Sequence, residues 1–385
     1  MRYSKFIDEE KKEVVFLVDG VIEVRIAKNI YEKYYAKQND EEIISLCPYK
    51  NIYNAITKRR LYFISERSRV PLIGHTAFGI IDRGTNLLQV RPSTGCNLNC
   101  IFCSVDEGKS KTRVTDYMVD ADYIANKFEE IADFKRKHHK NIAIEAHIDG
   151  QGEPFLYPYI EKLLRKLRDS ADIVSIQTNG TLLTKEKVKK FQAYIDRINL
   201  SINALNEKTA TLLAGCHYNL QHVLDIAEEI ASSNIDLLLA PVWVPGYNDD
   251  EIEKIVRFGR SIGAGKKWKA FGIQKYIRYK FGKKPQGAKA MDFKTFYKKL
   301  AEIGNDLKLY PKDFGIVKCK AIPKKFKLGE KIKLRIEMYG RMKNEMIAIA
   351  RDRIIQIIDT NRKLGDYVNV RIIRNKHNIY VAEEA

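Results

Sequence analysis

Three cysteines lie within eight residues of one another, at Cys96, Cys100 and Cys103. Three thiolates in so short a loop can converge on one metal centre. A structural zinc site would need a fourth Cys or His ligand close by, and the next histidine along the chain is His138. A [4Fe–4S] cluster held by three cysteines leaves one iron open to a ligand. The spacing therefore favours an iron–sulfur site, with a zinc knuckle or three unrelated thiols as the alternatives.

The cysteine loop follows a strand-like segment at residues 86–91, where a regular alternation of strands and helices begins. Further strands are expected at 142–149, 173–177, 197–202, 235–243 and 270–275, and helices at 120–136, 157–169, 184–195, 219–232 and 249–262. Six such units predict an α/β protein with a parallel sheet and right-handed crossovers. In that architecture the loops at the C-terminal ends of the strands build the site. Periodicity alone leaves open whether the sheet closes.

Glycines, amides and carboxylates follow the later strands at these ends. The segments are Asp149–Pro154, Gln177–Gly180, Ser201 with Asn203, Pro245–Asp249 and Gly272–Gln274. Any one of them has ordinary turn chemistry. Five in order, each at the end of an expected strand, are hard to explain as turns. They predict one shared site together with the cysteine loop.

The C-x3-C-x2-C pattern, with the aromatic Phe102 before its last cysteine, resembles the signature of radical S-adenosylmethionine (SAM) enzymes. The resemblance covers roughly residues 86–280 and implies a partial (β/α)6 barrel. It implies that Cys96, Cys100 and Cys103 hold a [4Fe–4S] cluster whose open iron chelates SAM. One electron, from a donor such as ferredoxin or flavodoxin, then splits the sulfonium C–S bond into methionine and a 5′-deoxyadenosyl radical.

The same resemblance implies which residues contact SAM at the strand ends. They are Phe102, Gln151, Gly152, Glu153, Thr178, Asn179, Ser201, Asn203 and Ile273. Gln151 departs from the family's Gly-Gly-Glu-Pro segment, where a glycine is usual. The catalytic residues of any second step are unknown, and Tyr247, Tyr276 and Cys319 are only side chains within expected reach.

Three further regions flank the expected barrel, which spans residues 86–281. Residues 1–85 form a small N-terminal module, with a hairpin that turns at Asp19-Gly20 and a mostly helical stretch over 28–64. Residues 282–328 are a basic connector with one helix near 292–307. Residues 329–385 contain five short strand-like runs, which predict a small β-barrel of OB type.

The C-terminal segment resembles a TRAM domain, a small β-barrel attached to RNA-modifying enzymes. The residues that carry the resemblance lie in Gly340–Glu345, Leu364–Ile372 and Tyr380–Glu383. It implies an RNA partner, with phosphate contacts from Arg341, Lys343, Arg371, Arg374 and Lys376. The alternative is a solvated basic barrel that only caps the catalytic domain.

The charge distribution agrees with an RNA partner. The chain carries a net charge of +19, and the whole surplus lies after residue 260, where 31 Lys and Arg face 12 Asp and Glu. Residues 1–260 are neutral. A neutral body with a basic appendage suits a polyanionic partner.

Missing features exclude several classes. No apolar run approaches the ~18 residues of a transmembrane helix, and residues 1–25 lack the apolar core of a signal peptide, so a cytoplasmic protein is expected. The N-terminal module holds only Cys47, which argues against the two-cluster tRNA methylthiotransferases. Only Cys319 lies after the barrel, which argues against the cyclase of molybdopterin biosynthesis, whose C-terminal region holds further cluster cysteines.

The leading hypothesis is a radical SAM enzyme that modifies RNA, with tRNA as the first expectation. A second hypothesis gives the same enzyme a peptide or small-molecule substrate. A third, from another class, is a non-catalytic iron–sulfur protein that binds RNA.

Overall fold

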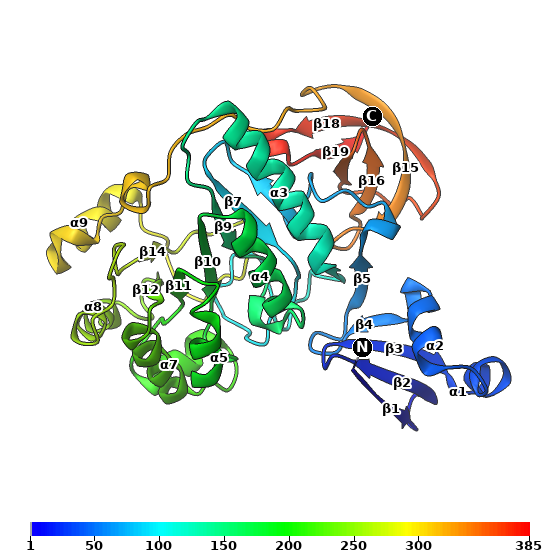
Figure 1. Cartoon of the computed structure of the whole chain (residues 1–385), viewed down its shortest axis with the longest axis horizontal. Coiled ribbons are helices and arrows are strands. Elements are labelled where there is room, and N and C mark those ends of the chain that lie inside the picture. Colours follow the sequence, from blue (N-terminus) through cyan, green and yellow to red (C-terminus); the bar gives the residue numbers. More distant parts are fainter. Residues whose placement is uncertain (1) are drawn as a thin grey trace.

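A central sheet organises the computed structural model, which describes residues 2–385 (Figure 1). Its strand order is β12-β11-β10-β9-β7-β6. The strands are β6 (Gly79–Asp82), β7 (Leu87–Arg91), β9 (Glu145–Ile148), β10 (Ile173–Thr178), β11 (Arg197–Leu200) and β12 (Asp236–Leu239). All neighbours pair in parallel except β6, which runs antiparallel to β7. The expected parallel α/β sheet is confirmed.

The sixth parallel strand is short and set apart. β13 (Val242–Trp243) pairs in parallel with β14 (Gln274–Lys275), and a single parallel bridge joins Leu239 to Phe271. The sheet therefore continues in fragments past β12. This arrangement agrees with the partial (β/α)6 barrel that the family resemblance implied.

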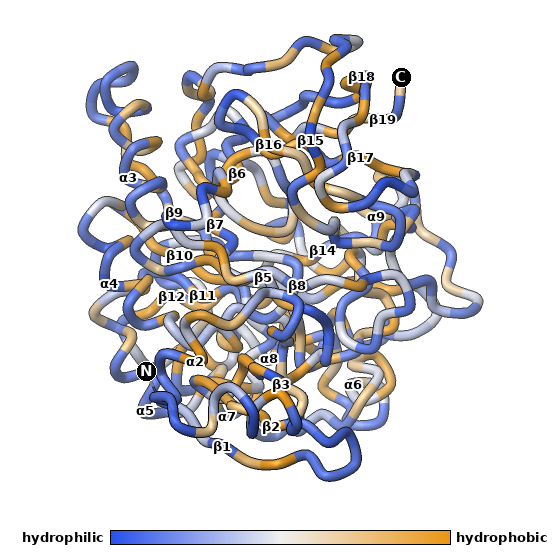
Figure 2. The backbone as a smooth tube through the Cα atoms, turned by 90° about the vertical axis from the view of Figure 1, so that its right-hand side faces the viewer, coloured by the Kyte–Doolittle hydropathy of each residue, from blue (hydrophilic) through white to orange (hydrophobic). Residues whose placement is uncertain are grey.

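Helices cover the outer face of the sheet, with α3 and α4 in front of β7, β9 and β10 in Figure 1. They are α3 (Ala121–His138), α4 (Ile160–Ser170), α5 (Lys185–Phe191), α6 (Glu207–Ala214), α7 (Leu220–Ser232) and α8 (Glu251–Ser261). α4 buries Ile160, Leu163, Leu164 and Leu167, the stripe that its helical spacing predicts. α6 was not expected from the sequence. Figure 2 shows apolar stretches along the strands in the middle and hydrophilic residues on the outer turns.

The N-terminal region is a six-stranded sheet rather than a hairpin with helices. Its order is β1 (Tyr3–Asp8), β2 (Glu13–Val18), β3 (Ile22–Ala27), β4 (Ile52–Asn54), β5 (Arg60–Ile64) and β8 (Thr115–Val119). The hairpin is confirmed, because Asp19 and Gly20 join β2 to β3 with positive φ at both positions. The helical stretch is shorter than expected, with α1 (Lys28–Ile30), a π-turn at Tyr31–Tyr35 and α2 (Asp40–Leu46).

The expected division at residue 85 needs correction at two strands. β6 precedes it but belongs to the central sheet, whereas β8 follows it and pairs in parallel with β5 of the N-terminal sheet. The β5–β8 pairing joins segments that are far apart in the sequence, so short-range pattern could not reveal it, whereas β6 and β7 form a local antiparallel hairpin. The chain between β7 and β8, which contains the cysteines, is thus anchored in both sheets.

The C-terminal region forms a closed five-stranded barrel in the order β15-β16-β17-β19-β18. The strands are β15 (Lys331–Tyr339), β16 (Met346–Ala350), β17 (Arg353–Ile357), β18 (Tyr367–Arg374) and β19 (Val381–Glu384), and the connector before them holds α9 (Phe293–Ile303). The five strands are confirmed, and the TRAM assignment stays a prediction. No helix within residues 2–385 is long and apolar enough to cross a membrane.

The C-terminal barrel packs directly on the rest of the chain. Ile354 donates its N–H to the Ile73 carbonyl, and Tyr380 donates to Gly74. Gly74 has a φ of +130°, and a Cβ there would collide with the Ile354 backbone. The Tyr117 hydroxyl of β8 donates to the Tyr339 carbonyl at 2.9 Å. The barrel therefore meets β8, the strand that follows the cysteine loop.

Candidate active site: a cysteine loop over the strand ends

The cysteine loop, residues 92–108, leaves β7 at its C-terminal end and begins by extending the sheet. Gly95 pairs in parallel with Gly152, donating its N–H to the Gln151 carbonyl and accepting from the Glu153 N–H at 2.9 Å. A Cβ on Gly152 would collide with the Gly95 carbonyl. A glycine is required here because two backbones meet. The pairing fixes the position from which Cys96 starts.

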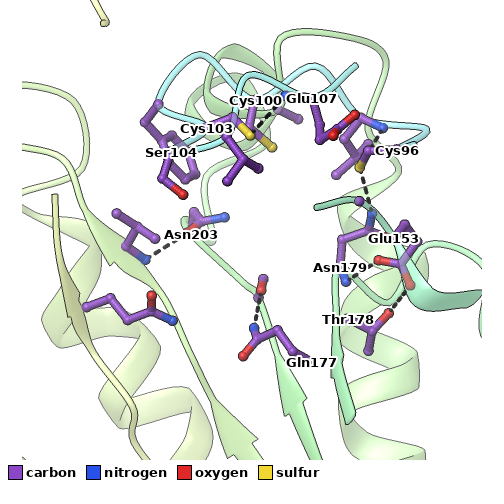
Figure 3. Close-up of a pocket in the computed structure, with 18 of the residues that line it drawn as sticks. Cys96, Cys100, Cys103, Ser104, Glu107, Glu153, Gln177, Thr178, Asn179 and Asn203 are labelled. Carbon is purple, nitrogen blue, oxygen red and sulfur yellow. Dashed lines mark hydrogen bonds between the residues drawn. The ribbon is translucent and has the colours of Figure 1, made fainter. Parts of the chain in front are cut away.

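The three thiols face one end of a pocket below the loop (Figure 3). The Leu98 N–H donates to the Cys96 sulfur at 3.4 Å, and the Asn179 amide lies 3.9 Å from the same sulfur. The Glu107 N–H donates to the Cys103 sulfur at 3.3 Å. Hydrogen bonds of this kind stabilise a thiolate and tune an iron–sulfur centre.

Burial alone would keep these thiols protonated. It raises the pKa of Cys96, Cys100 and Cys103, and in the case of Cys100 to about 12, with Cys103 and Cys216 adding to the shift. Iron would offset this cost, since a bound metal deprotonates its thiol ligands outright. No group of Cys, His, Asp or Glu across residues 2–385 is gathered for a single metal ion. Three spaced thiols and no fourth ligand fit a cluster of several irons better than one zinc.

Two other segments support the loop from the side. Asn99 and Ile101 donate their N–H groups to the carbonyls of Ala214 and Leu213 at the end of α6. The Lys283 ammonium, from the connector, donates at 2.5 Å to the Asn99 side chain and to the Glu107 carbonyl. No pattern in the sequence predicted these contacts. They show that the connector takes part in shaping the loop.

A buried ion cluster closes the far end of the loop. Arg59 and Arg341 both bond to the Glu107 carboxylate, and Arg341 also bonds to Asp116 of β8. Burial would lower the pKa of Arg341, but these two carboxylates hold it above its ordinary value. The side chain is 2% exposed, and both terminal nitrogens of its guanidinium bond to carboxylates. The prediction that Arg341 contacts an RNA phosphate is therefore wrong, because its charge is neutralised inside the protein.

The pocket under the loop has a volume of about 330 Å³, which is in the usual range for a small-molecule site. Seven of the expected SAM residues line it, namely Phe102, Gly152, Glu153, Thr178, Asn179, Ser201 and Asn203. They come from the cysteine loop and the ends of β9, β10 and β11. The parallel sheet brings them together, as its topology predicts.

Glu153 organises the floor of this pocket. Its carboxylate accepts from the Thr178 hydroxyl at 2.7 Å and from the N–H groups of Asn179 and Phe155 at 2.8 and 3.0 Å. Burial raises the pKa of Glu153, while these donors act to lower it. Three donors leave about one acceptor position for a ligand. Glu153 therefore both fixes the end of β10 and offers one oxygen to a cation.

Amide side chains line the other walls. Gln177 donates to the Ser201 hydroxyl at 2.7 Å, and the Asn203 side-chain oxygen accepts the Val242 N–H at 2.9 Å. Asn179 donates at 3.0 Å to the side chain of Asn97, the residue after the first cysteine. Each side chain is held by the protein before any ligand binds. Such preorganisation lowers the cost of ordering the site.

Two expected SAM residues do not line the pocket. The Gln151 side chain turns away, with its amide nitrogen 3.3 Å from the Thr76 hydroxyl, and borders a different cavity. Ile273 is buried behind the wall, whereas the next residues, Gln274 to Ile277, line the pocket. In both cases the motif is at the predicted strand end but the side chain faces another way.

Tyr247, Tyr276 and Cys319, the side chains expected within reach of the site, lie in three different places. Tyr276 is buried and lines the pocket. Tyr247 points to the Gln286 carbonyl outside it. Cys319 lies beside Lys135, near the start of the central strands and thus at the opposite end from the cysteines.

The other residues predicted to contact RNA also lie in different places. Lys343 and Arg374 line a second cavity beside the loop. Arg371 instead pairs with Glu383 at 2.5 Å on the outside of the barrel. Lys376 is exposed in a short turn away from either cavity.

The part of the chain that builds this site matches a known protein family. Residues 90–259 match the model of the radical SAM superfamily. The chain is 44% identical over 371 residues to the uncharacterized protein MJ0103 of Methanocaldococcus jannaschii, covering 89% of this chain and 84% of that protein. It is 27% identical over 180 residues to a probable GTP 3′,8-cyclase of Methanocella arvoryzae, covering 46% of this chain and 54% of the relative. Streptococcus suis SuiB bound to S-adenosylmethionine aligns with a TM-score of 0.43 at 21% identity, covering 60% and 48%.

The chain belongs to the radical SAM superfamily. It is an enzyme whose cofactors are a [4Fe–4S] cluster and SAM. The match to the cyclase spans only about half of that protein's length, so it identifies the shared barrel and leaves the substrate open.

Proposed function

We propose that this radical SAM enzyme modifies RNA, with tRNA as its substrate class. The observation that carries the proposal is the uncompensated positive charge after residue 260. Within residues 2–385, no lysine of that region forms an ion pair with a carboxylate, whereas arginines such as Arg335, Arg351 and Arg362 do. A surface that leaves its lysines unpaired favours a polyanion.

The position of these charges adds to the argument. Lys109 and Lys111 follow the cysteine loop, Lys280 precedes the connector and Lys284 lies within it. These four lysines line one concave surface beside the loop. A phosphate backbone that runs along this surface passes next to the pocket. Electrostatic attraction of this kind positions the chain without reading its sequence.

The proposal assigns the cluster to Cys96, Cys100 and Cys103 and SAM to the pocket below them. The bound cluster supplies one electron, received from a donor such as ferredoxin or flavodoxin, for cleavage of SAM. The chain's own residues hold the pocket in shape: Glu153 offers an oxygen to the SAM ammonium, and Asn179 holds the start of the cysteine loop. The proposal includes a cytoplasmic location, where tRNA and these donors are found.

The experiment compares modified nucleosides in a strain that lacks the gene with those in its parent. Mass spectrometry of nucleosides from purified tRNA and rRNA should show one modification lost and restored by the wild-type gene. A strain complemented with a Cys100→Ala variant is the matched control and should not restore it. An unchanged profile across tRNA and rRNA would contradict the proposal.

A free nucleotide is the second candidate substrate. It is favoured by the relatives named GTP 3′,8-cyclase, which match the barrel at 24–29% identity. Incubation of the reconstituted enzyme with SAM, a reductant and GTP distinguishes the two. Consumption of GTP in step with release of 5′-deoxyadenosine would favour this candidate over RNA.

A further inference from the structure

A second cavity lies between the cysteine loop and the C-terminal barrel, with a volume of about 680 Å³. Ser104 and Tyr279 line both this cavity and the SAM pocket, so the two spaces adjoin. Ser104 directly follows Cys103 (Figure 3). A ligand that fills the second cavity therefore reaches the wall of the pocket beside the cysteines.

Positive charge dominates the lining of this second cavity. Lys111, Arg113, Lys280, Lys343 and Arg374 line it, and in the described residues 2–385 none of them pairs with a carboxylate. The carboxyl groups in the lining are those of Glu345, which is buried and accepts the Met342 N–H at 3.1 Å, and Asp359. A concave surface with this excess of cations attracts anions strongly.

The outer face of the same barrel is different. There Arg335 pairs with Glu337, Arg351 with Glu330, Arg362 with Glu384 and Arg371 with Glu383. Among the arginines of the barrel within residues 2–385, Arg374, which lines the cavity, is the one without a carboxylate partner.

Three buried polar atoms of residues that line the cavity have no hydrogen-bond partner among residues 2–385: His75 Nε2, Gln151 Oε1 and Arg341 Nε. All three atoms are closed off from solvent, and His75 Nε2 lies 3.7 Å from Glu345 Oε1. Because a ligand in the cavity does not reach these atoms, the exposed cations and rings of the lining define the ligand.

Aromatic side chains also line the second cavity. Tyr279 and Phe281 line the cavity with 50% and 45% of their surface exposed. Exposed aromatic rings beside cations are the usual platform for a nucleobase, which stacks on the ring while its phosphate pairs with Lys or Arg.

We infer that the second cavity is the substrate subsite and takes a nucleotide, with its phosphate on Lys343 and Arg374 and its base on Phe281 or Tyr279. The inference rests on the proposed function, because it supplies the substrate for radical chemistry in the adjoining pocket. The nucleotide belongs either to an RNA chain or to a free nucleoside triphosphate. The cavity offers cations for the phosphate and aromatic rings for the base of one ligand.

The test uses the full-length, anaerobically reconstituted enzyme and two probes: tRNA from the deletion strain, and GTP. Lys343→Gln, Arg374→Gln and the double variant are compared with Arg371→Gln, which lies on the same barrel but is paired outside the cavity. The double variant should weaken tRNA binding about 10-fold or more and lower the slope of log K against log salt by about 2. Arg371→Gln should change tRNA binding less than about twofold, and SAM binding should stay unchanged in all four variants.

The outcomes distinguish a failure of the cavity inference from a failure of the proposed function. If GTP binds through Lys343 and Arg374 while tRNA does not, the nucleotide site stands and RNA modification fails. If tRNA binds equally well to the wild type and the double variant, the cavity inference is overturned while RNA modification can still stand. If neither probe binds the wild type at moderate salt, the inference is also overturned.

A second variant tests the aromatic part. Phe281→Leu should weaken binding of the same probe several-fold, because stacking needs a π face, and Phe281→Tyr should retain it. Equal binding by both variants would remove the base from Phe281 and overturn that assignment.

Discussion

Two buried ion clusters lie at opposite ends of the central sheet. Each joins the C-terminal third of the chain to the radical SAM barrel. At the end where the strands begin, Lys135 of α3 bonds to Asp82 at 2.8 Å, and both side chains are fully buried. The same ammonium lies 3.3 Å from the Cys319 sulfur, and Asp82 accepts the Ile322 N–H at 2.9 Å. This cluster fastens the connector to the sheet.

At the end where the strands finish, Arg59 and Arg341 enclose Glu107 and Asp116. Glu107 also lines the SAM pocket, and Arg341 lines the second cavity. Through the Glu107 N–H, which donates to Cys103, this cluster reaches a proposed iron ligand.

The two clusters are alike in burial and in charge, and they differ in what they border. Buried ion pairs are common scaffold elements whose net contribution to stability is small. The difference teaches that buried charge alone does not mark a functional site. A cavity and a shared backbone contact with the cysteine loop make the distinction here.

The largest difference in cluster content and activity is expected between variants of two cysteines, one at each end of the central sheet. Cys100→Ala should abolish the brown absorbance of the reconstituted cluster and all reductive SAM cleavage, because a cluster ligand is lost. Cys319→Ala, its matched control, should retain both. Ultraviolet–visible spectra and release of 5′-deoxyadenosine measure the outcome. A cluster that survives in Cys100→Ala would refute the ligand assignment.

Arg341→Met should affect both stability and the cluster. It leaves the Glu107 and Asp116 carboxylates buried with Arg59 as their remaining arginine, and losing one partner of a buried pair costs about 3–5 kcal/mol. Since Glu107 belongs to the cysteine loop, iron content per folded molecule should fall as well. Chemical unfolding and iron analysis measure the two effects. Full iron content in the folded variant would show that the loop does not depend on Arg341.

Lys135→Met should lose a similar free energy of unfolding, about 3–5 kcal/mol, because Asp82 stays buried without its cation. In this variant the iron–sulfur cluster content and the SAM cleavage per folded molecule should match those of the wild type. A fall in iron content equal to that of Arg341→Met would erase the proposed difference between the two ends.

Glu107→Gln should lower the free energy of unfolding by the smallest amount of the three ion-cluster variants. It removes the charge but keeps the backbone N–H that donates to Cys103, and Arg341 retains Asp116. Loss of hydrogen bonds to a charged group costs about 1.5–3 kcal/mol. Iron content should lie between the Arg341→Met and wild-type values, which anaerobic reconstitution can measure.

Local pattern was sufficient for much of this fold. The β7 strand, the amphipathic α4 and the Asp19-Gly20 hairpin were predicted because each depends on neighbouring residues. The strand-end motifs were predicted to meet because parallel strands finish at one edge. The same reasoning placed Glu153 and Asn179 in one pocket.

What failed depends on contacts between distant segments. The β5–β8 pairing and the burial of Arg341 join parts of the chain that no local pattern connects. Gln151 was placed at the correct strand end with the wrong orientation. A basic residue in a TRAM-like segment looks the same in sequence whether it faces a phosphate or a buried carboxylate.

The arrangement of Arg341 has a consequence for the order in which the enzyme is made. The cysteines emerge from the ribosome early, but Glu107 gains one of its two arginines only when the C-terminal barrel has been synthesised. Domains generally fold from the N-terminus during synthesis. We therefore expect the cysteine loop to complete its shape only when the C-terminal barrel has folded, which would make iron insertion a late step in the maturation of the enzyme.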